Sequence, residues 1–349
     1  MVKVGLLAFA NDGGLGAQTR RLAAMLKPDR VLIVESRGIS PNKQFHLEWY
    51  KDYQFFLTNS FPPSNNEIEH FLQGLTHVFC VENPYNFNLL YYAEKMGIKV
   101  FCQSNYEFCD NLDKMYLPVP TKFLMPSMWK VEEMRKLFPE KVQYLPPPID
   151  PDEFKEARAI NSRRSGKRRF LHVIGTPASF DRNGTMDLLD AVKICKADFD
   201  LVIKSQHPLS MNVFLDDPRV KYDFNGAETN NELYKDFDVL LLPRRYGGLC
   251  LTCNEALMSK MPVVMTNISP NNYLLPDHWQ VESEKKESFF ARSPIDIYSS
   301  KPESLSDTIE MFCDMSDDDM EIEKLLALGI AMNNFSSKHL LPKYQELLK

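Results

Sequence analysis

Short runs of apolar and β-branched residues alternate with amphipathic segments along this sequence, and the alternation starts afresh near residue 170. This rhythm is typical of strand–helix–strand units that build a parallel sheet. The runs are almost continuously apolar, as expected of strands that helices cover on both faces. The sequence therefore predicts an α/β protein with two consecutive doubly wound domains.

The first half of the chain supplies the first set of predicted elements. Its strands are expected at Val2–Phe9, Arg30–Val34, Gln54–Leu57, His77–Val81, Lys99–Gln103, Lys122–Met125 and Val142–Tyr144. Its helices are expected at Thr19–Leu26, Asn88–Met96 and 127–138, the last with Ser127 as its N-cap.

The alternation breaks at Pro146-Pro147-Pro148, because three consecutive prolines remove three amide donors and fix three φ angles. A polar stretch follows and ends in the basic cluster 163–169. We expect a domain boundary near residue 150. The first domain then covers 1–150, the second covers 151–335, and a terminal helix at 336–349 returns to the first.

The second half repeats the pattern. Strands are expected at Phe170–Gly175, Leu201–Ser205, Val220–Phe224, Val239–Pro243 and Pro262–Thr266. Helices are expected at Thr185–Ile194, Leu305–Cys313, Met320–Ala331 and Leu341–Leu348.

Composition excludes several classes of protein. Hydrophobic residues make up 44% and charged residues 25% of the 349 residues, which describes a globular chain, and no apolar run is long enough to span a membrane. The first residues lack the features of a signal peptide, so we expect a cytoplasmic protein. The net charge of −6 argues against a surface that binds nucleic acid throughout, although the cluster 163–169 is locally basic.

The seven cysteines are scattered, as expected of small apolar residues in a reducing compartment. Cys250 and Cys253 form a CxxC pair, a spacing found in zinc sites and in redox-active dithiols. A zinc site would need a second ligand pair, which the sequence does not supply. We interpret both cysteines as core residues.

Two glycine-containing turns can hold phosphate groups. The first, 11–16, follows the first predicted strand, where glycines admit a ligand close to the backbone and a helix N-terminus offers amides. It departs from the GxGxxG of dinucleotide enzymes, which ranks a dehydrogenase low. The second, 243–250, joins a buried strand to a helix that carries Glu255, whose carboxylate can accept two ribose hydroxyls.

The segment 240–264 resembles the donor-site signature of retaining GT-B glycosyltransferases, in which two glutamates with seven residues between them flank a glycine-rich turn. Glu255 matches the second glutamate, which holds the donor ribose in that family. Gly247 stands where the family has the first, which approaches the transferred sugar. Arg245 or Tyr246 would take over part of that role. Residues 126–154 and 170–184 resemble further family stretches in the same order.

The resemblance implies a GT-B fold, with two Rossmann-like domains facing each other across a cleft. The donor would be a nucleotide sugar, first of all a UDP-sugar, bound mainly by the second domain. Donor contacts are expected from Gly14, Gly16, Thr176, Tyr246, Gly247, Gly248, Leu249, Cys250 and Glu255.

The leaving diphosphate must be stabilised by a metal or by fixed cations and amides. In the resembling family a lysine and an arginine do this, but Asn183 and Pro177 occupy their positions here. We assign the task to Arg182, Lys204 and Arg245, with no metal and no cofactor. The Asp-x-Asp stretches 198–200 and 236–238 are interpreted as solvated strand ends rather than metal ligands.

The acceptor is expected at the first domain. The stretch 99–106 resembles a family strand that ends in a histidine beside the sugar, and Asn105 stands at that position. An asparagine can orient a hydroxyl but cannot act as a base. Tyr106, Glu107, Glu82 and Asn83 lie on the same predicted rim, although each could equally well cap a strand end. His172, inside an apolar strand, is interpreted as a core residue.

These features predict a glycosyltransferase that transfers a hexose or pentose to an acceptor hydroxyl, with retention implied by the resemblance. The acceptor is a glycan or glycolipid. A second hypothesis is a hydroxymethylated base in DNA, as in virus-encoded DNA glycosyltransferases of the same broad fold, with the cluster 163–169 and Arg20-Arg21 on phosphates. The alternative is a non-catalytic nucleotide-sugar binder or inactive partner subunit, because Gly247, Pro177 and Asn183 depart from the family pattern.

Overall fold

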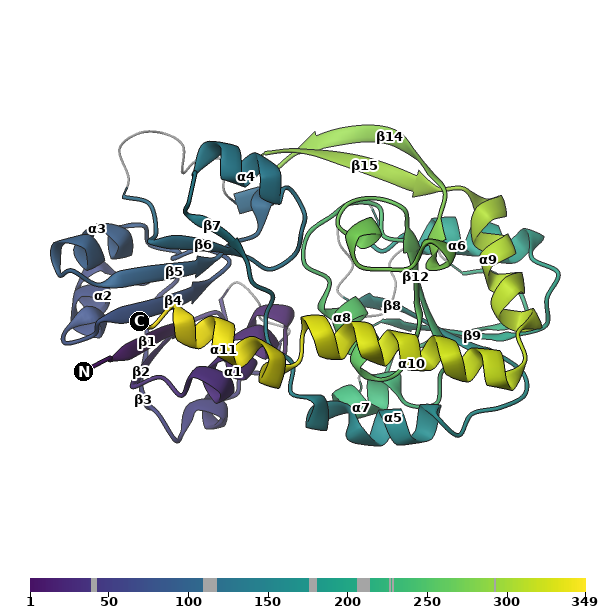
Figure 1. Cartoon of the computed structure of the whole chain (residues 1–349), viewed down its shortest axis with the longest axis horizontal. Coiled ribbons are helices and arrows are strands. Elements are labelled where there is room, and N and C mark those ends of the chain that lie inside the picture. Colours follow the sequence, from purple (N-terminus) through teal and green to yellow (C-terminus); the bar gives the residue numbers. More distant parts are fainter. Residues whose placement is uncertain are drawn as a thin grey trace. The chain divides into compact units, whose positions relative to one another are not determined.

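The computed structural model describes residues 1–38, 43–108, 118–175, 181–205, 214–225, 227, 229–291 and 293–349. The chain forms two compact units (Figure 1). The first comprises Met1–Pro148, Ala291–Ser293 and Ser337–Lys349, and the second comprises Ile149–Phe290 and Pro294–Ser336. Each unit contains a parallel sheet with helices packed on it, so the predicted α/β class is confirmed.

The first unit contains a seven-stranded parallel sheet in the order β3-β2-β1-β4-β5-β6-β7. Its strands are β1 (Val4–Ala8), β2 (Arg30–Ile33), β3 (Gln54–Leu57), β4 (His77–Val81), β5 (Lys99–Gln103), β6 (Lys122–Met125) and β7 (Val142–Tyr144). Its helices are α1 (Gly14–Leu26), α2 (Asn65–Leu72), α3 (Asn88–Lys95), α4 (Val131–Leu137) and α11 (Ser337–Glu346), with short 3-10 turns at Leu47–Tyr50 and Tyr106–Phe108.

Successive residues of β1 serve two separate cores, because side chains alternate between the faces of a strand. Leu6 packs in a cluster with residues of α1 and α11, including Leu22 and Tyr344. Leu7 packs in another cluster with residues of α2 and α3, including Phe71. Both faces of this sheet are therefore covered, which explains the almost continuous apolar character of its strands.

The second unit contains a six-stranded parallel sheet in the order β10-β9-β8-β11-β12-β13 and a separate antiparallel hairpin, β14-β15. The strands are β8 (Arg169–Gly175), β9 (Asp200–Ser205), β10 (Val220–Asp223), β11 (Val239–Leu242), β12 (Val263–Thr266), β13 (Gln280–Val281), β14 (Ser283–Phe290) and β15 (Pro294–Ser300). The helices are α5 (Lys155–Asn161), α6 (Thr185–Ile194), α7 (Asn230–Tyr234), α8 (Leu251–Met258), α9 (Pro302–Asp314) and α10 (Asp317–Asn334), with 3-10 turns at Pro151–Phe154, Asn271–Tyr273 and Asp277–Trp279.

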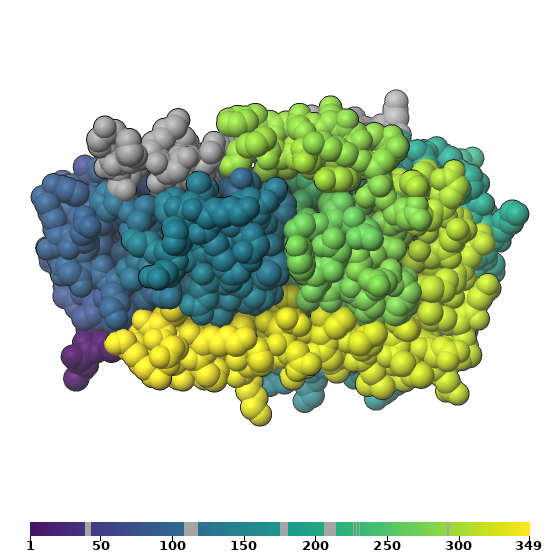
Figure 2. Space-filling model, turned by 45° about the horizontal axis from the view of Figure 1, so that its top comes forward, coloured from purple at the N-terminus to yellow at the C-terminus, as the bar shows by residue number. Residues whose placement is uncertain are grey.

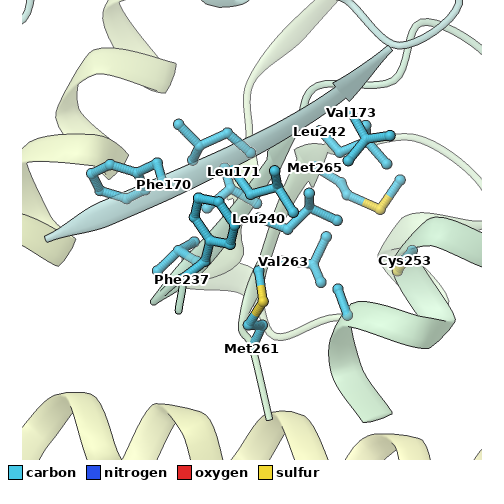
Figure 3. Packing of buried hydrophobic residues seen from close by; sticks show 14 of the residues in the cluster. Phe170, Leu171, Val173, Phe237, Leu240, Leu242, Cys253, Met261, Val263 and Met265 are labelled. Atoms are coloured by element: carbon cyan, nitrogen blue, oxygen red, sulfur yellow. The ribbon is translucent and has the colours of Figure 1, made fainter. Parts of the chain in front are cut away.

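The core of the second unit is formed where β8, β11 and β12 meet the helices. Figure 3 shows Leu171 of β8, Leu240 of β11 and Val263 of β12 in one cluster, with Cys253 on the side of α8 that faces it. These side chains are almost fully buried, between 0% and 2% exposed. This packing holds β8, β11 and β12 against the helices, and so positions the loops that follow the carboxyl ends of these strands.

The hairpin β14-β15 was not predicted from the sequence. In Figure 2 its light-green atoms lie on the visible surface, and β14 exposes most of its residues. The sequence of β14 is mostly charged and polar, so it carries no apolar pattern that would indicate a strand. In β15, however, buried Ile295 and Ile297 alternate with more polar residues. That alternation is a strand signal that the sequence reading missed.

Two helix starts differ from the prediction. Helix α1 begins at Gly14 rather than near Thr19, since the glycines let the chain turn tightly before they enter the helix. Helix α4 begins at Val131, with Lys130 as its N-cap residue, so the prediction of Ser127 as N-cap is wrong. The Ser127 hydroxyl instead accepts a bond from the Trp129 amide in the preceding turn, at 3.4 Å.

A buried charge network lies at the amino-terminal edge of the six-stranded sheet. Asp238, 1% exposed, accepts bonds from Lys324 Nζ at 2.8 Å, Arg164 Nε at 2.8 Å and the Arg169 amide at 2.9 Å. Lys324 is itself only 2% exposed. The interpretation of 236–238 as a solvated strand end is therefore wrong for Asp238, because α10 covers that end and carries the lysine.

His172 is a satisfied core residue, as predicted. It is fully buried in β8, with Nδ1 at 2.8 Å from Leu241 O and Nε2 at 3.0 Å from the Thr185 hydroxyl. Burial lowers the pKa of His172 below its ordinary value of 6.5. Protonation is therefore opposed in the native state and unopposed after unfolding.

Because His172 takes up a proton more readily in the unfolded chain than in the native protein, we expect the protein to lose stability in mild acid. As pH falls below about 6.5, the unfolded chain takes up a proton that native His172 excludes, so the free energy of unfolding should fall by up to about 1.4 kcal/mol per pH unit. Urea denaturation from neutral pH down to about pH 5.5 measures this slope. The substitution His172→Gln should flatten it, whereas His278→Gln, at a 43% exposed side chain, should leave it unchanged. An equal slope in His172→Gln would contradict the assignment.

Candidate functional site

The candidate site lies at the carboxyl edge of the six-stranded sheet. In its strand order, β8 has β9 on one side and β11 on the other, so the connections leaving these strands diverge between β8 and β11. Ligands of open α/β sheets bind at such a switch point. The segments that flank it are 181–184, before α6, and 243–250, between β11 and α8.

These two segments are in direct contact through Gly184. Its φ of 72° lies in the left-handed region, and a Cβ placed on it would come within 2.0 Å of Pro243 O. Only glycine can therefore occupy this position without displacing backbone. Asp181 fixes the same turn by accepting bonds from the amides of Thr185 and Met186, at 3.0 and 2.8 Å.

Arg182 is held against the glycine-containing turn. Its Nη2 donates to Gly247 O at 2.9 Å, and its guanidinium carbon lies 4.7 Å from the centre of the Tyr246 ring. Its own carbonyl accepts the Arg245 amide at 2.9 Å. Arg182, Tyr246, Gly247 and Arg245 were predicted to act together, and the structure brings them together.

Arg245 is also connected to the hairpin. Its Nε donates to Tyr298 O at 3.1 Å, and its carbonyl accepts the Tyr298 amide at 2.8 Å. Next to it, the Asp187 carboxylate accepts bonds from the Ser299 hydroxyl at 2.7 Å and the Ser300 amide at 2.8 Å. Burial raises the pKa of Asp187. The sequence reading missed Asp187, because only the fold brings β15 to α6.

Glu255 is a buried carboxylate on the helix that follows the glycine turn. It is 7% exposed and lies on α8, and its Oε2 accepts the Tyr234 hydroxyl at 2.8 Å. Tyr234, at the end of α7, is fully buried. A carboxylate has about four acceptor positions, and the tyrosine hydroxyl occupies one of them. The tyrosine was not predicted, because nothing in its sequence context marks it as a partner of α8.

Three further residues were singled out in the sequence as donor contacts or as counterparts of family residues, namely Lys204, Asn183 and Thr176. Lys204, at the end of β9, has a side chain that is 17% exposed and places Nζ 3.6 Å from Asp223 Oδ2. Asn183, which occupies the position of the family lysine, donates its amide to Val173 O and Ile174 O at 2.9 and 3.1 Å. It is therefore engaged by the backbone of β8. Thr176 lies outside the described residues.

The turn ends in a cap formed by a cysteine. Gly248 adopts a φ of 103°, which favours glycine. Leu249 O accepts a bond from Arg244 Nη1 at 3.1 Å. Cys250 is the N-cap of α8, and its sulfur accepts the Cys253 amide at 3.4 Å. The amino terminus of α8 thus directly follows the glycine turn, where amides can contact an anion.

Two of the predicted donor residues, Gly14 and Gly16, lie in the first unit at the start of α1. A Cβ on Gly16 would come within 1.7 Å of Asn11 O, so the close approach of the backbone there requires glycine. A Cβ on Gly13 would come within 2.3 Å of Lys43 Nζ, which places an ammonium group at this loop. No motif marks Lys43 in the sequence.

The predicted acceptor residues follow two neighbouring strands, β4 and β5, at the carboxyl edge of the seven-stranded sheet. Asn105 and Glu107 come directly after β5, as does Tyr106, whose ring lies 5.7 Å from that of Trp129. After β4, the Glu82 carboxylate accepts the Tyr85 hydroxyl at 2.9 Å, and Asn83 Oδ1 accepts the Tyr85 amide at 2.7 Å. Glu82 and Asn83 therefore also shape the turn itself.

Most cations of the basic cluster 163–169 form ion pairs with carboxylates of the second unit. Arg164 pairs with Asp236 and Asp238, Lys167 pairs with Asp198 and Asp200, Arg168 pairs with Asp317, and Arg169 pairs with Asp236. Cations neutralised in this way add little to phosphate binding.

Within the ranges that the structure describes, no group of three or more His, Cys, Asp or Glu side chains is arranged to hold a metal ion. Over the same residues, no helix has the length and apolar character that crossing a membrane requires.

Comparison with solved structures identifies the fold as GT-B, as predicted. A glycosyltransferase from Rickettsia africae matches with a TM-score of 0.70 and 16% identity, over 100% of this chain and 98% of that one. Anabaena HepE in complex with UDP-glucose matches at 0.67 and 12%, over 100% and 99%. The lipopolysaccharide outer core galactosyltransferase WaaB matches at 0.61 and 14%, over 99% of both chains. No protein-family model and no curated protein matches the sequence.

Proposed function

We propose that this chain is a glycosyltransferase that takes a sugar from a nucleotide diphosphate donor, first of all a UDP-sugar. The observation that carries the proposal is the site between β8 and β11, where the Arg182-bound glycine turn leads directly into α8, the helix that carries buried Glu255. The same fold binds UDP-glucose in Anabaena HepE. Glu255 would accept the ribose hydroxyls, and the turn amides would contact the diphosphate.

The second unit's own cations would stabilise the leaving nucleoside diphosphate. Negative charge builds up on the diphosphate as the glycosidic bond breaks, and fixed donors lower the energy of that state. Arg182 is held by Gly247 O and Tyr246, Lys204 lies at the end of β9, and Arg245 is positioned by the hairpin. In this proposal these groups act without a metal ion, and retention of configuration follows from the family resemblance.

We propose a glycan or glycolipid as the acceptor. The ion pairs of the cluster 163–169 argue against DNA, because four of its cations already have carboxylate partners. The rim formed by Glu82, Asn83, Asn105, Tyr106 and Glu107 offers hydroxyl-binding groups and an aromatic ring, which suit a sugar.

A non-catalytic nucleotide-sugar binder remains the second candidate, and two observations favour it. The Asn183 amide is engaged by β8 carbonyls, and Gly247 contributes no carboxylate to the turn. Binding without turnover would identify this case, since the donor would then be held without the group that the family places beside the transferred sugar.

Thermal denaturation with a panel of UDP-, GDP- and ADP-sugars tests the proposal. A ligand that binds only the native state should stabilise it by about 2.7 kcal/mol at a concentration of about 100 times Kd. Release of free nucleotide, with and without glycan acceptors, then separates an enzyme from a binder. If no nucleotide sugar raises the melting temperature, the proposed function is wrong.

A further inference from the structure

The pair Cys250 and Cys253 lies at the start of α8, immediately after the glycine turn. Cys250 is the N-cap residue and is partly exposed, whereas Cys253 is 2% exposed. Figure 3 shows Cys253 on the side of α8 that faces the core. The Cys250 sulfur accepts the Cys253 amide at 3.4 Å. A partly exposed cysteine and a buried one therefore lie three residues apart at the start of the same helix.

The spacing of the two residues suits a disulfide. Positions three residues apart at a helix start have Cα atoms about 5 Å apart. A disulfide spans Cα separations of about 4.4–6.8 Å. Rotation of the two side chains, without movement of α8, would therefore be enough to join the sulfurs.

A buried guanidinium lies beside the pair. Arg244 is 4% exposed and donates Nη1 to Leu249 O, the residue before Cys250. Its Nε is buried and has no hydrogen-bond partner among the residues described. The positive charge of Arg244 lowers the pKa of Cys253, but burial raises it by more. A helix amino terminus stabilises a thiolate, the reactive form of cysteine, and Cys250 is the N-cap residue of α8.

The two thiols differ in the way that thiol–disulfide exchange requires. Burial raises the pKa of Cys253 well above its usual value, so this residue stays a thiol in the native state. Cys250 accepts an amide hydrogen bond and is accessible, so it is the residue that can attack. Both cysteines pack at the core of the second unit, but only Cys250 is also partly exposed.

We propose that Cys250 and Cys253 form a redox-active dithiol, which a low-molecular-mass disulfide converts into an intramolecular disulfide at the start of α8. The Cys250 thiolate attacks one sulfur of the oxidant and releases its other half as a thiolate. That thiolate accepts the Cys253 proton, and the Cys253 sulfur displaces the second half from Cys250. The protein loses two electrons and two protons, and the oxidant becomes two thiols.

The disulfide would alter the donor turn. The Cys250 sulfur would leave its capping position, so the Cys253 amide would lose its acceptor and the turn 247–250 would shift. This consequence rests on the proposed function, because that turn is where we place the diphosphate. We expect oxidised protein to bind UDP-glucose about tenfold more weakly, the effect of losing one or two hydrogen bonds.

Incubation of the reduced protein with oxidised glutathione tests the pair directly. Alkylation and peptide mapping should locate a disulfide between Cys250 and Cys253 that dithiothreitol reverses. The substitution Cys253→Ala should stop the reaction at a glutathione adduct on Cys250, because no thiol remains to displace it. Cys80 and Cys102, adjacent on β4 and β5 but 1% and 2% exposed, should stay reduced and provide the matched control.

Each outcome separates the two proposals. If Cys250 acquires neither glutathione nor a disulfide while the protein stays folded, the redox pair is ruled out. If the disulfide forms and UDP-glucose binding is unchanged, its effect on the donor turn is wrong. If the disulfide forms in a protein whose reduced form binds no nucleotide sugar, the proposed function fails and the redox pair stands.

Discussion

Replacing Glu255 by glutamine should weaken the binding of UDP-glucose by about 10- to 100-fold. The glutamate is 7% exposed, and its Oε2 accepts the Tyr234 hydroxyl. A hydrogen bond to a charged group contributes about 1.5–3 kcal/mol, which corresponds to that range of affinity. Glutamine keeps the volume of the side chain, so the melting temperature of the free protein should change little. Calorimetric titration with UDP-glucose measures the loss.

Two variants control this result. Tyr234→Phe keeps the carboxylate but removes the hydroxyl that orients it, so it should weaken binding less than Glu255→Gln. Glu303→Gln, in the first turn of α9, should leave affinity unchanged. If the folded Glu255→Gln protein binds UDP-glucose as tightly as the unchanged protein, the donor ribose does not contact Glu255.

The substitution Asp238→Asn should destabilise the protein by about 3–5 kcal/mol. Asp238 accepts three donors while 1% exposed, and Lys324 at 2% exposure would be left with a buried charge and no counter-ion. Breaking a buried pair by changing one partner has a cost of this size. It would be a large part of the total stability of a typical domain, about 5–15 kcal/mol. Urea denaturation followed by circular dichroism measures it.

A second substitution in the same network tests whether the loss of stability comes from the unpaired charge of Lys324 or from disrupted packing. Lys324→Met combined with Asp238→Asn removes both charges, so the double variant should be more stable than Asp238→Asn alone. Asp200→Asn, which removes a 36% exposed partner of Lys167, should change stability by less than about 0.5 kcal/mol. A double variant no more stable than the single one would refute the account.

The sheets were predictable because their strands obey local rules. The strands β3, β4, β5, β6 and β7 occur where they were predicted. A central strand such as β4, which is buried throughout, is apolar along its whole length because both faces of the sheet are covered. Helix α6 begins and ends as predicted, at Thr185 and Ile194. Helices α9 and α10 extend beyond their predicted cores, because their first turns are polar and carry no apolar periodicity.

Features that depend on tertiary contacts could not be read from the sequence. Strand β14 is charged and exposed, and its partner β15 is held by Asp187 and Arg245. From the sequence, Asp238 was interpreted as an exposed strand end. In the structure it is covered by α10, which begins almost eighty residues later and carries Lys324. In both cases the decisive partner is distant in sequence and has no motif of its own.

The candidate site shows the same division. Motif spacing predicted that Arg182 and Gly247 come together, because the carboxyl ends of neighbouring parallel strands meet at one sheet edge. Motif spacing could not show that Asn183 is engaged by β8, nor that Tyr234 orients Glu255. The roles of these residues in binding and catalysis stay predictions until the variants are measured.

Helix α11 carries a consequence for biosynthesis. Although α11 follows the whole second unit in the sequence, Tyr344 is fully buried in the first unit, where its hydroxyl donates to Pro146 O at 3.0 Å and accepts Gln103 Nε2 at 3.0 Å. Domains commonly fold in the order in which the ribosome makes them. Here the amino-terminal unit must wait for residues 337–349 to emerge before it can close its core. During translation, the second unit can therefore reach its native state before the first.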